Sequence, residues 1–130
     1  MAEKKIALVT GANKGIGYET SRQLAQRGIR VLMGARDTGR GNVAAGKLQA
    51  ESLDVEPLLL DVTDSSHICE VRAMIEKAYG RLDILVNNAG IAHADEPLFT
   101  NSTATVSRQA LRETFDINFF GLVELTQALL

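Results

Sequence analysis

Residues 6–17 read IALVTGANKGIG, an apolar run that leads into a glycine-rich turn and then into an amphipathic stretch. This order predicts a buried strand, a tight turn and a helix. Gly11 suits the turn off the strand, Gly15 lets the backbone approach a phosphate closely, and Gly17 lets the helix pack against the sheet. The spacing is GxxxGxG, not GxGxxG, and such a turn alone is only a weak sign of nucleotide binding.

Outward from this stretch, predicted strands alternate with predicted helices. The alternation predicts an α/β fold with a doubly wound parallel sheet, and 130 residues suffice for one domain, residues 1–130, but not for two. Leucines run together at 58–60, as expected for a strand covered on both faces. Strands are predicted over 5–10, 29–35, 56–62 and 82–87, and helices over 15–27, 41–53, from a cap at Thr63 or Asp64 to Gly80, and from 107 to the end.

The composition excludes several classes of partner. The net charge of −2 gives no reason to expect nucleic acid or an anionic membrane, and no apolar run reaches membrane-spanning length. The single cysteine, Cys69, excludes a disulfide framework and favours a reducing, cytoplasmic location. On the third helix we expect Cys69 to be buried and His67 to be solvated, without a second metal ligand. In the first helix we expect Ile16 to face inward.

Polar residues follow the carboxyl end of each predicted strand. Arg36 follows the second strand, Asp61 ends the third and Asn88 follows the fourth. In an open parallel sheet these ends meet at one edge, where ligands bind, so we expect one continuous crevice. Taken alone, Asp61 is equally well interpreted as an acid that caps the following helix.

Together these segments resemble the N-terminal part of a short-chain dehydrogenase/reductase, most closely the carbonyl reductases. The resemblance covers essentially the whole chain and implies a Rossmann-type sheet, truncated after the fifth helix region. The matching pieces stand in family order: TGANKGIG at 10–17, ARD at 35–37, LDV at 60–62, NNAG at 87–90, and Asn118.

The resemblance implies a binding role for most of these residues. The glycine-rich loop and the start of its helix are expected to hold the pyrophosphate, and the later segments to hold the adenosine. Asp61 and the Val62 amide would contact adenine, and Asn88 and Gly90 would line the ribose. The residues assigned to the pyrophosphate loop are Gly11, Asn13, Lys14, Gly15, Ile16 and Gly17.

The cofactor is predicted to be NADP. NAD-dependent members of the family place an acid at the end of the second strand, where this chain has Ala35 followed by Arg36. Lys14 approaches from the other side, and two cations favour a 2′-phosphate. Asp37 is the competing candidate for a ribose-binding acid, and we interpret it as a surface residue or helix cap.

The activity implied is hydride transfer between NADP(H) and a small carbonyl or alcohol. The family uses a Tyr-x-x-x-Lys pair, a Ser and an Asn, and only the Asn, Asn118, is present. Tyr18 and Tyr79 are followed four residues later by Arg22 and Asp83. We therefore expect the 130-residue chain to be inactive by itself. A nucleotide-binding or interaction module without chemistry stays open as the alternative.

The last predicted helix is apolar nearly all round. Leu111, Leu122 and Leu129 lie on one stripe, and Phe119 and Phe120 lie beside it. Such a helix needs burial on more than one side. We expect it to support a homo-oligomer.

Overall fold

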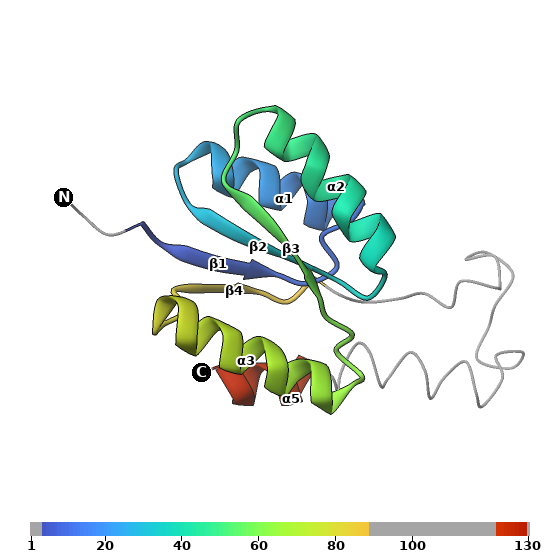
Figure 1. Cartoon of the computed structure of the whole chain (residues 1–130), viewed down its shortest axis with the longest axis vertical. Helices are drawn as coiled ribbons and strands as arrows, with labels where there is room; N and C mark the ends of the chain where they lie inside the picture. Colours follow the sequence, from blue (N-terminus) through green and yellow to red (C-terminus); the bar gives the residue numbers. More distant parts are fainter. Residues whose placement is uncertain (1–3, 89–121, 130) are drawn as a thin grey trace, which may run out of the picture.

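The computed structural model describes residues 4–88 and 122–129, which form a four-stranded parallel sheet between two helical layers (Figure 1). The strands lie in the order β3-β2-β1-β4, so the first strand is central and the chain crosses over it after β3. This is the doubly wound arrangement predicted from the sequence. The elements are β1 (Ile6–Val9), α1 (Gly15–Gln26), β2 (Arg30–Ala35), α2 (Thr38–Ala50), β3 (Val55–Leu59), α3 (Ser65–Tyr79), β4 (Ile84–Val86) and α5 (Leu122–Leu129).

The two faces of the sheet carry separate apolar clusters. Because side chains alternate along a strand, Leu8 of β1 faces α3 and α5, whereas its neighbour Val9 faces α1 and α2. Leu32 and Met33 of β2 alternate in the same way, and all four side chains are at most 1% exposed. The strand that leads into the glycine loop is therefore held rigidly from both sides.

Two helices end next to the glycines that were predicted to terminate them. Gly28, in the left-handed conformation with φ of 81°, directly follows the Arg27 cap of α1, and Gly80, with φ of 72°, caps α3. At the other end of α3 the open choice between Thr63 and Asp64 is resolved, because the Asp64 side chain accepts hydrogen bonds from the N–H groups of Ser66 and His67. Asp64, and not Asp61, is the capping acid.

The second helix begins three residues earlier than predicted. Asp37 is its N-cap and accepts a hydrogen bond from the Arg40 N–H, 2.9 Å away. This confirms the interpretation of Asp37 as a cap. The cap compensates for the two glycines, Gly39 and Gly41, in the first turn, and Gly41 packs where a Cβ would lie 3.2 Å from the Ala35 Cβ.

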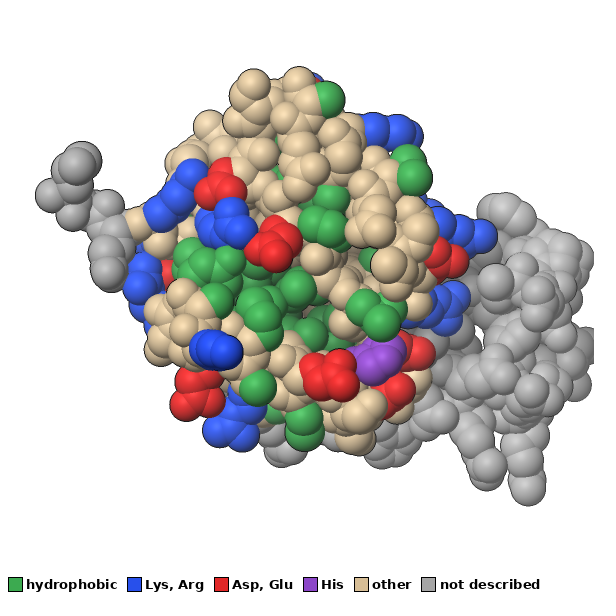
Figure 2. Space-filling view, in the orientation of Figure 1, with side chains coloured by type: hydrophobic (Ala, Val, Ile, Leu, Met, Phe, Trp, Pro, Cys, Tyr) green, Lys and Arg blue, Asp and Glu red, His purple; other side chains and the backbone are tan. Residues whose placement is uncertain are grey.

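Three burial predictions were wrong. β3 is an edge strand, and Leu59 on it is 47% exposed, so the leucine run at 58–60 is not covered on both faces. Figure 2 shows apolar side chains gathered around this edge, between the helical layers. Ile16 is 78% exposed at the start of α1. Cys69 is exposed because it lies beside, and not on, the buried stripe of α3.

The amino ends of the strands are tied together by ionic and polar contacts, which we call the Arg30 cluster: Arg30, Asp54, Glu56, Tyr79 and Lys4. The Arg30 guanidinium pairs with Asp54, lies 2.6 Å from Glu56 Oε2, and donates to the Tyr79 hydroxyl at 2.6 Å. Lys4 Nζ adds a 2.8 Å ion pair to Asp54. The cluster joins β2 to β3 and α3 at the amino ends of the strands, whereas the glycine loop lies at their carboxyl ends.

The predicted final helix is described only in part. α5 covers Leu122–Leu129, and Ala128 and Leu129 pack against the core cluster beneath α3. Residues 107–121, and with them Leu111, Phe119 and Phe120, lie outside the described residues. Among the described residues, no helix has the length and hydropathy needed to cross a bilayer.

Candidate nucleotide-binding site

The glycine loop leaves β1 at the carboxyl edge of the sheet. Gly11 and Gly15 both have left-handed backbones, with φ of 61° and 59°, which glycine adopts without strain. Ala12 N–H donates to the Gly34 carbonyl at 3.0 Å, which fixes the loop against β2. The two positive φ values turn the chain so that α1 starts directly above the end of β1.

Gly17 and Asn88 close the other side of the loop. A Cβ on Gly17 would lie 2.3 Å from the Gly11 carbonyl oxygen and 2.5 Å from Asn88 Nδ2, so no other residue fits there. Asn88 Nδ2 donates to the Gly11 carbonyl at 3.1 Å, and its backbone N–H donates to Thr10 Oγ1 at 2.9 Å. Asn88 therefore supports the loop itself, and its predicted contact with the ribose stays a prediction.

The start of α1 differs from the starts of α2 and α3. Its N-cap, Lys14, makes no side-chain capping bond, whereas Asp37 and Asp64 cap α2 and α3 with their carboxylates. The first N–H groups of a helix have no intrahelical partner and carry the positive end of the helix dipole. The first turn, with Gly15, Ile16 and Gly17, thus offers amide donors to an anion, which is what a pyrophosphate needs.

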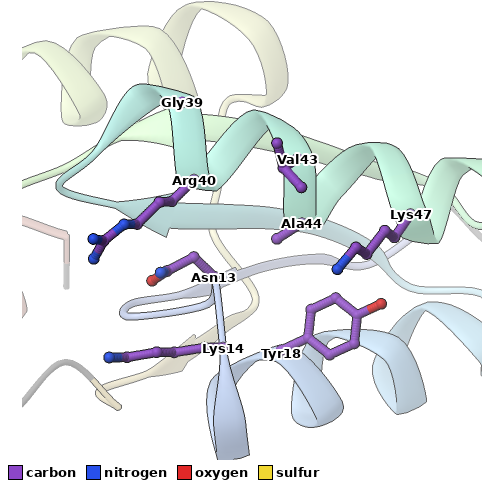
Figure 3. Close-up of a pocket in the computed structure, with 8 residues that line it drawn as sticks. All are labelled: Asn13, Lys14, Tyr18, Gly39, Arg40, Val43, Ala44 and Lys47. Atoms are coloured by element: carbon purple, nitrogen blue, oxygen red, sulfur yellow. The ribbon is translucent and has the colours of Figure 1, made fainter.

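A pocket of about 540 Å³ opens between α1 and α2 beside this helix start. In Figure 3 the side chains of Asn13, Lys14 and Arg40 extend toward one end of the pocket, and Tyr18 and Lys47 lie at the other. Cations from two helices thus line the same cavity. The lining residues are Asn13, Lys14, Tyr18, Gly39, Arg40, Val43, Ala44 and Lys47.

Among the described residues, two cations share the pocket with Lys14, namely Arg40 and Lys47, and the sequence analysis missed both. Arg40 is the one whose side chain extends to the same end of the pocket as Lys14. Arg36, the predicted partner, is exposed after β2 and is not among the residues that line this pocket. Arg40 stands in the first turn of α2, with its Nε 4.0 Å from Asp37 Oδ2. Had the predicted helix been started from the cap at Asp37, it would have begun at Thr38. Arg40 would then have been predicted in its first turn, near the glycine loop.

The turn after β3 holds Asp61 in a fixed conformation. Asp61 Oδ1 accepts hydrogen bonds from the Thr63 N–H at 2.9 Å and the Thr63 hydroxyl at 2.6 Å. Its own N–H donates to His67 Nδ1 at 3.1 Å. The His67 side chain is 23% exposed, so it is only partly solvated. Val62 beside it is 5% exposed.

Asp64, one turn away, is an ionised cap. The hydrogen bond from the Ser66 hydroxyl, together with those from the backbone N–H groups of His67 and Ser66, holds the pKa of Asp64 below its usual value, against the opposing effect of desolvation. The charge stabilises the N-terminus of α3 and lies beside the imidazole, with Asp64 Oδ2 3.5 Å from His67 Nε2.

Two predicted site residues, Gly90 and Asn118, lie outside the described residues. The others follow β1, β2, β3 and β4, which run parallel, so they meet at one edge of the sheet. Within the described part of the chain, no group of three or more His, Cys, Asp or Glu side chains could hold a metal ion.

A glycine loop, an uncapped helix start and a cation-lined pocket at the carboxyl ends of a parallel sheet are features with which doubly wound α/β proteins bind dinucleotides. Comparison with known proteins gives the family. The family model for short chain dehydrogenases matches residues 5–130. The chain belongs to the short-chain dehydrogenase family.

Individual relatives agree with this assignment. Carbonyl reductase (NADPH) 1 of Bos taurus is 42% identical over 126 residues, which are 96% of this chain and 43% of that protein. (-)-Isopiperitenone reductase of Mentha piperita is 50% identical over 97 residues, 71% of this chain and 31% of that protein. The chain therefore spans less than half the length of these curated relatives.

Solved structures show the same fold. A short-chain dehydrogenase from Streptomyces avermitilis superposes with a TM-score of 0.85 at 32% identity, over 99% of this chain and 44% of the other. An actinorhodin polyketide ketoreductase with NADPH superposes with a TM-score of 0.87 at 29% identity, over 99% of this chain and 48% of the other.

Proposed function

We propose that this chain is the NADP(H)-binding part of a short-chain reductase that interconverts small carbonyls and alcohols. The observation that carries the proposal is the uncapped start of α1 next to a pocket that Lys14 and Arg40 both line. The names of the relatives support it, since the bovine protein is named as an NADPH carbonyl reductase and the ketoreductase structure as a complex with NADPH.

Each part of the edge would hold one part of the cofactor. The amides of residues 11–17 bind the pyrophosphate, and Lys14 and Arg40, with Arg36 outside the pocket, bind the 2′-phosphate. Asp61 and Val62 bind adenine, and Asn88 and Gly90 line the ribose. The bound nicotinamide supplies the hydride, and the described residues of this chain bind and orient the cofactor.

Calorimetric titration with NADP⁺ and with NAD⁺ measures the selectivity for NADP and so tests this arrangement. We expect NADP⁺ to bind more tightly, by roughly tenfold to a hundredfold, because each charge-assisted contact contributes about 1.5–3 kcal/mol. Arg40→Ala and Lys14→Ala lower this ratio. Lys47→Ala, which removes a cation from the other end of the pocket, lowers it less.

The same titration distinguishes the contributions of Arg36 and Arg40 to NADP selectivity. If the pocket holds the 2′-phosphate, Arg40→Ala lowers the NADP⁺ to NAD⁺ ratio more than Arg36→Ala does. Equal binding of both nucleotides, with neither substitution changing the ratio, contradicts the proposed NADP selectivity.

Catalysis is proposed to require residues that these 130 do not contain. Asn118 takes the proton-relay role, but the sequence has no Tyr-x-x-x-Lys pair. We expect no carbonyl reduction when the purified 130-residue polypeptide is mixed with NADPH and a simple ketone. Turnover that Asn118→Ala abolishes contradicts this expectation. The homo-oligomer through the last helix and the cytoplasmic location stay predictions.

A further inference from the structure

His67 links the first turn of α3 to the end of β3. Its Nδ1 accepts the hydrogen bond from the Asp61 N–H, and its Nε2 lies 3.5 Å from Asp64 Oδ2. A nitrogen that accepts carries no hydrogen, so the ring is neutral with its proton on Nε2. That proton faces the carboxylate that caps the helix.

Asp61 is therefore held from both sides. His67 accepts a hydrogen bond from the backbone N–H of Asp61, and the Thr63 N–H and hydroxyl donate to Oδ1 of the Asp61 carboxylate. The second carboxylate oxygen and the following Val62 N–H have no recorded hydrogen-bond partner among the described residues. These two groups are the ones assigned to adenine.

We propose that His67 is a positioning residue, which holds Asp61 and Val62 in the conformation that takes the adenine and releases them when its imidazole gains a proton. This inference rests on the proposed NADP-binding function. It adds a proton-sensitive element to the adenine end of that site.

Protonation breaks the contact for a simple reason. Both ring nitrogens of the imidazolium are donors, so Nδ1–H would face the Asp61 N–H, donor against donor. The acidic residues at the ring are Asp64, whose Oδ2 lies 3.5 Å from Nε2, and Asp61, whose N–H donates to Nδ1; Glu70 follows three residues further along α3. Figure 2 shows acidic side chains gathered beside the histidine. They attract a cation, but none replaces the acceptor that Asp61 N–H loses.

The sign of the pH effect follows. Because the binding conformation contains the neutral ring, a proton on the imidazole competes with adenine binding, so affinity falls as the pH falls. The affinity for NADP⁺ is measured by titration at several pH values. We expect it to be roughly threefold to tenfold lower at about pH 5.5 than at about pH 8, which corresponds to the loss of one ordinary hydrogen bond.

Two substitutions of similar size separate this role from a general structural one. His67→Asn keeps an acceptor oxygen at the δ position and cannot be protonated, so it should bind as the wild type does at about pH 8 and lose the His67 part of the pH dependence. His67→Gln moves the acceptor to the ε position, beyond reach of the Asp61 N–H. It should bind more weakly at every pH.

The cofactor's 2′-phosphate also titrates in this range, but all variants share that effect, and the difference between the wild type and His67→Asn removes it. Identical pH profiles for these two proteins, or full affinity of His67→Gln at about pH 8, overturn the positioning role. Thermal unfolding of each variant identifies a change that is only in stability. Absence of NADP⁺ binding by the wild type at any pH overturns the proposed function itself.

Discussion

Gly17 shows how one missing side chain shapes the site. A methyl group there would overlap the Gly11 carbonyl and the Asn88 amide. We predict that Gly17→Ala destabilises the fold by about 2 kcal/mol or more and abolishes nucleotide binding, because the loop must open to admit the Cβ. Chemical denaturation and calorimetry measure both effects.

The matched control is Gly46→Ala. Gly46 is an exposed residue of α2 with nothing within 4 Å of its ideal Cβ. Alanine should stabilise the helix there by about 0.5–1 kcal/mol, since glycine is a poor helix former. Equal effects at the two positions would mean that the overlap at Gly17 does not matter.

Thr10 joins the glycine loop to β4. Its side chain, 2% exposed, accepts from the Asn88 N–H at 2.9 Å and lies 3.3 Å from the Val86 carbonyl. We predict that Thr10→Val lowers the free energy of unfolding by about 0.5–1.5 kcal/mol, because it removes the hydroxyl's hydrogen bonds and leaves the Asn88 N–H with only the Val86 carbonyl, 3.1 Å away, among the described acceptors. Urea denaturation measures it. Thr20→Val on α1 should change stability by less than about 0.5 kcal/mol.

At single positions the sequence predicted backbone demands better than side-chain exposure. Gly11 makes the turn that its place after the strand predicted, with a left-handed φ of 61° that few other residues adopt. Gly15 was predicted only as the point of close approach to a phosphate, and its left-handed φ of 59° was not foreseen. The exposure of Ile16 and Cys69 was mispredicted. Cys69 follows Ile68, which is on the buried stripe, and one residue along a helix rotates a side chain by about 100°, which puts it outside.

Among the elements, α2 carries Arg40 of the pocket and depends on its N-cap. We predict that Asp37→Ala destabilises the protein by about 1 kcal/mol and also lowers NADP⁺ affinity, because the first turn that positions Arg40 frays. Asp37→Asn, which keeps a capping oxygen, should preserve both properties. Thermal denaturation and titration test the pair, and equal behaviour of the two variants contradicts the prediction.

The start of this helix was missed for a physical reason. Glycines at 39 and 41 lower helix propensity, and the pattern of apolar residues is thin, so propensity placed the start at 41. The cap at Asp37 and the packing of Gly41 against Ala35 outweigh that preference. The packing of Gly41 depends on a neighbour in another element, whereas the Asp37 cap is a local signal that the prediction did not use to place the helix start. The strand boundaries, which depend on local apolar runs, were predicted within a few residues.

The Arg30 cluster makes the packing of β2, β3 and α3 sensitive to acid. Burial raises the pKa of Asp54, but the hydrogen bond from Lys4 and the charge of Arg30 outweigh it, so the pKa lies below its usual value of 3.8. A folded-state pKa below the unfolded one gives stability that is present above about pH 4 and lost as the pH falls through the folded value.

We predict that the urea midpoint falls between pH 7 and pH 3, and that Asp54→Asn reduces this fall. The asparagine cannot ionise, so its share of the stability is absent at both pH values. A fall of the same size in the variant would assign the acid sensitivity to other carboxylates, such as Asp83, whose pKa the Ile6 N–H also lowers.

For the whole molecule, ligand binding should appear as stability. A cofactor that binds only the folded chain stabilises it by RT ln(1 + [L]/Kd), about 2.7 kcal/mol at one hundred times Kd. We predict that NADP⁺ raises the melting temperature more than NAD⁺ at equal concentration. Adenosine alone, which lacks phosphates, serves as the control, and an equal shift with all three contradicts a phosphate-directed site.

The overall topology followed from the sequence, but the spatial order of the strands did not. Alternating apolar runs and amphipathic stretches predicted a parallel sheet, and the motif after β1 predicted which edge binds. That β3 lies at the edge, with Leu59 exposed, depends on the direction of the crossovers, which local pattern does not encode. The same limit applies to Arg40, whose partner Lys14 is distant in the chain.

The Arg30 cluster and the glycine loop lie at opposite ends of the same strands. The length of the strands therefore separates the charges that hold the sheet together from the charges that would bind a ligand. A protein engineer can therefore rebuild one end for heat tolerance and leave recognition untouched at the other.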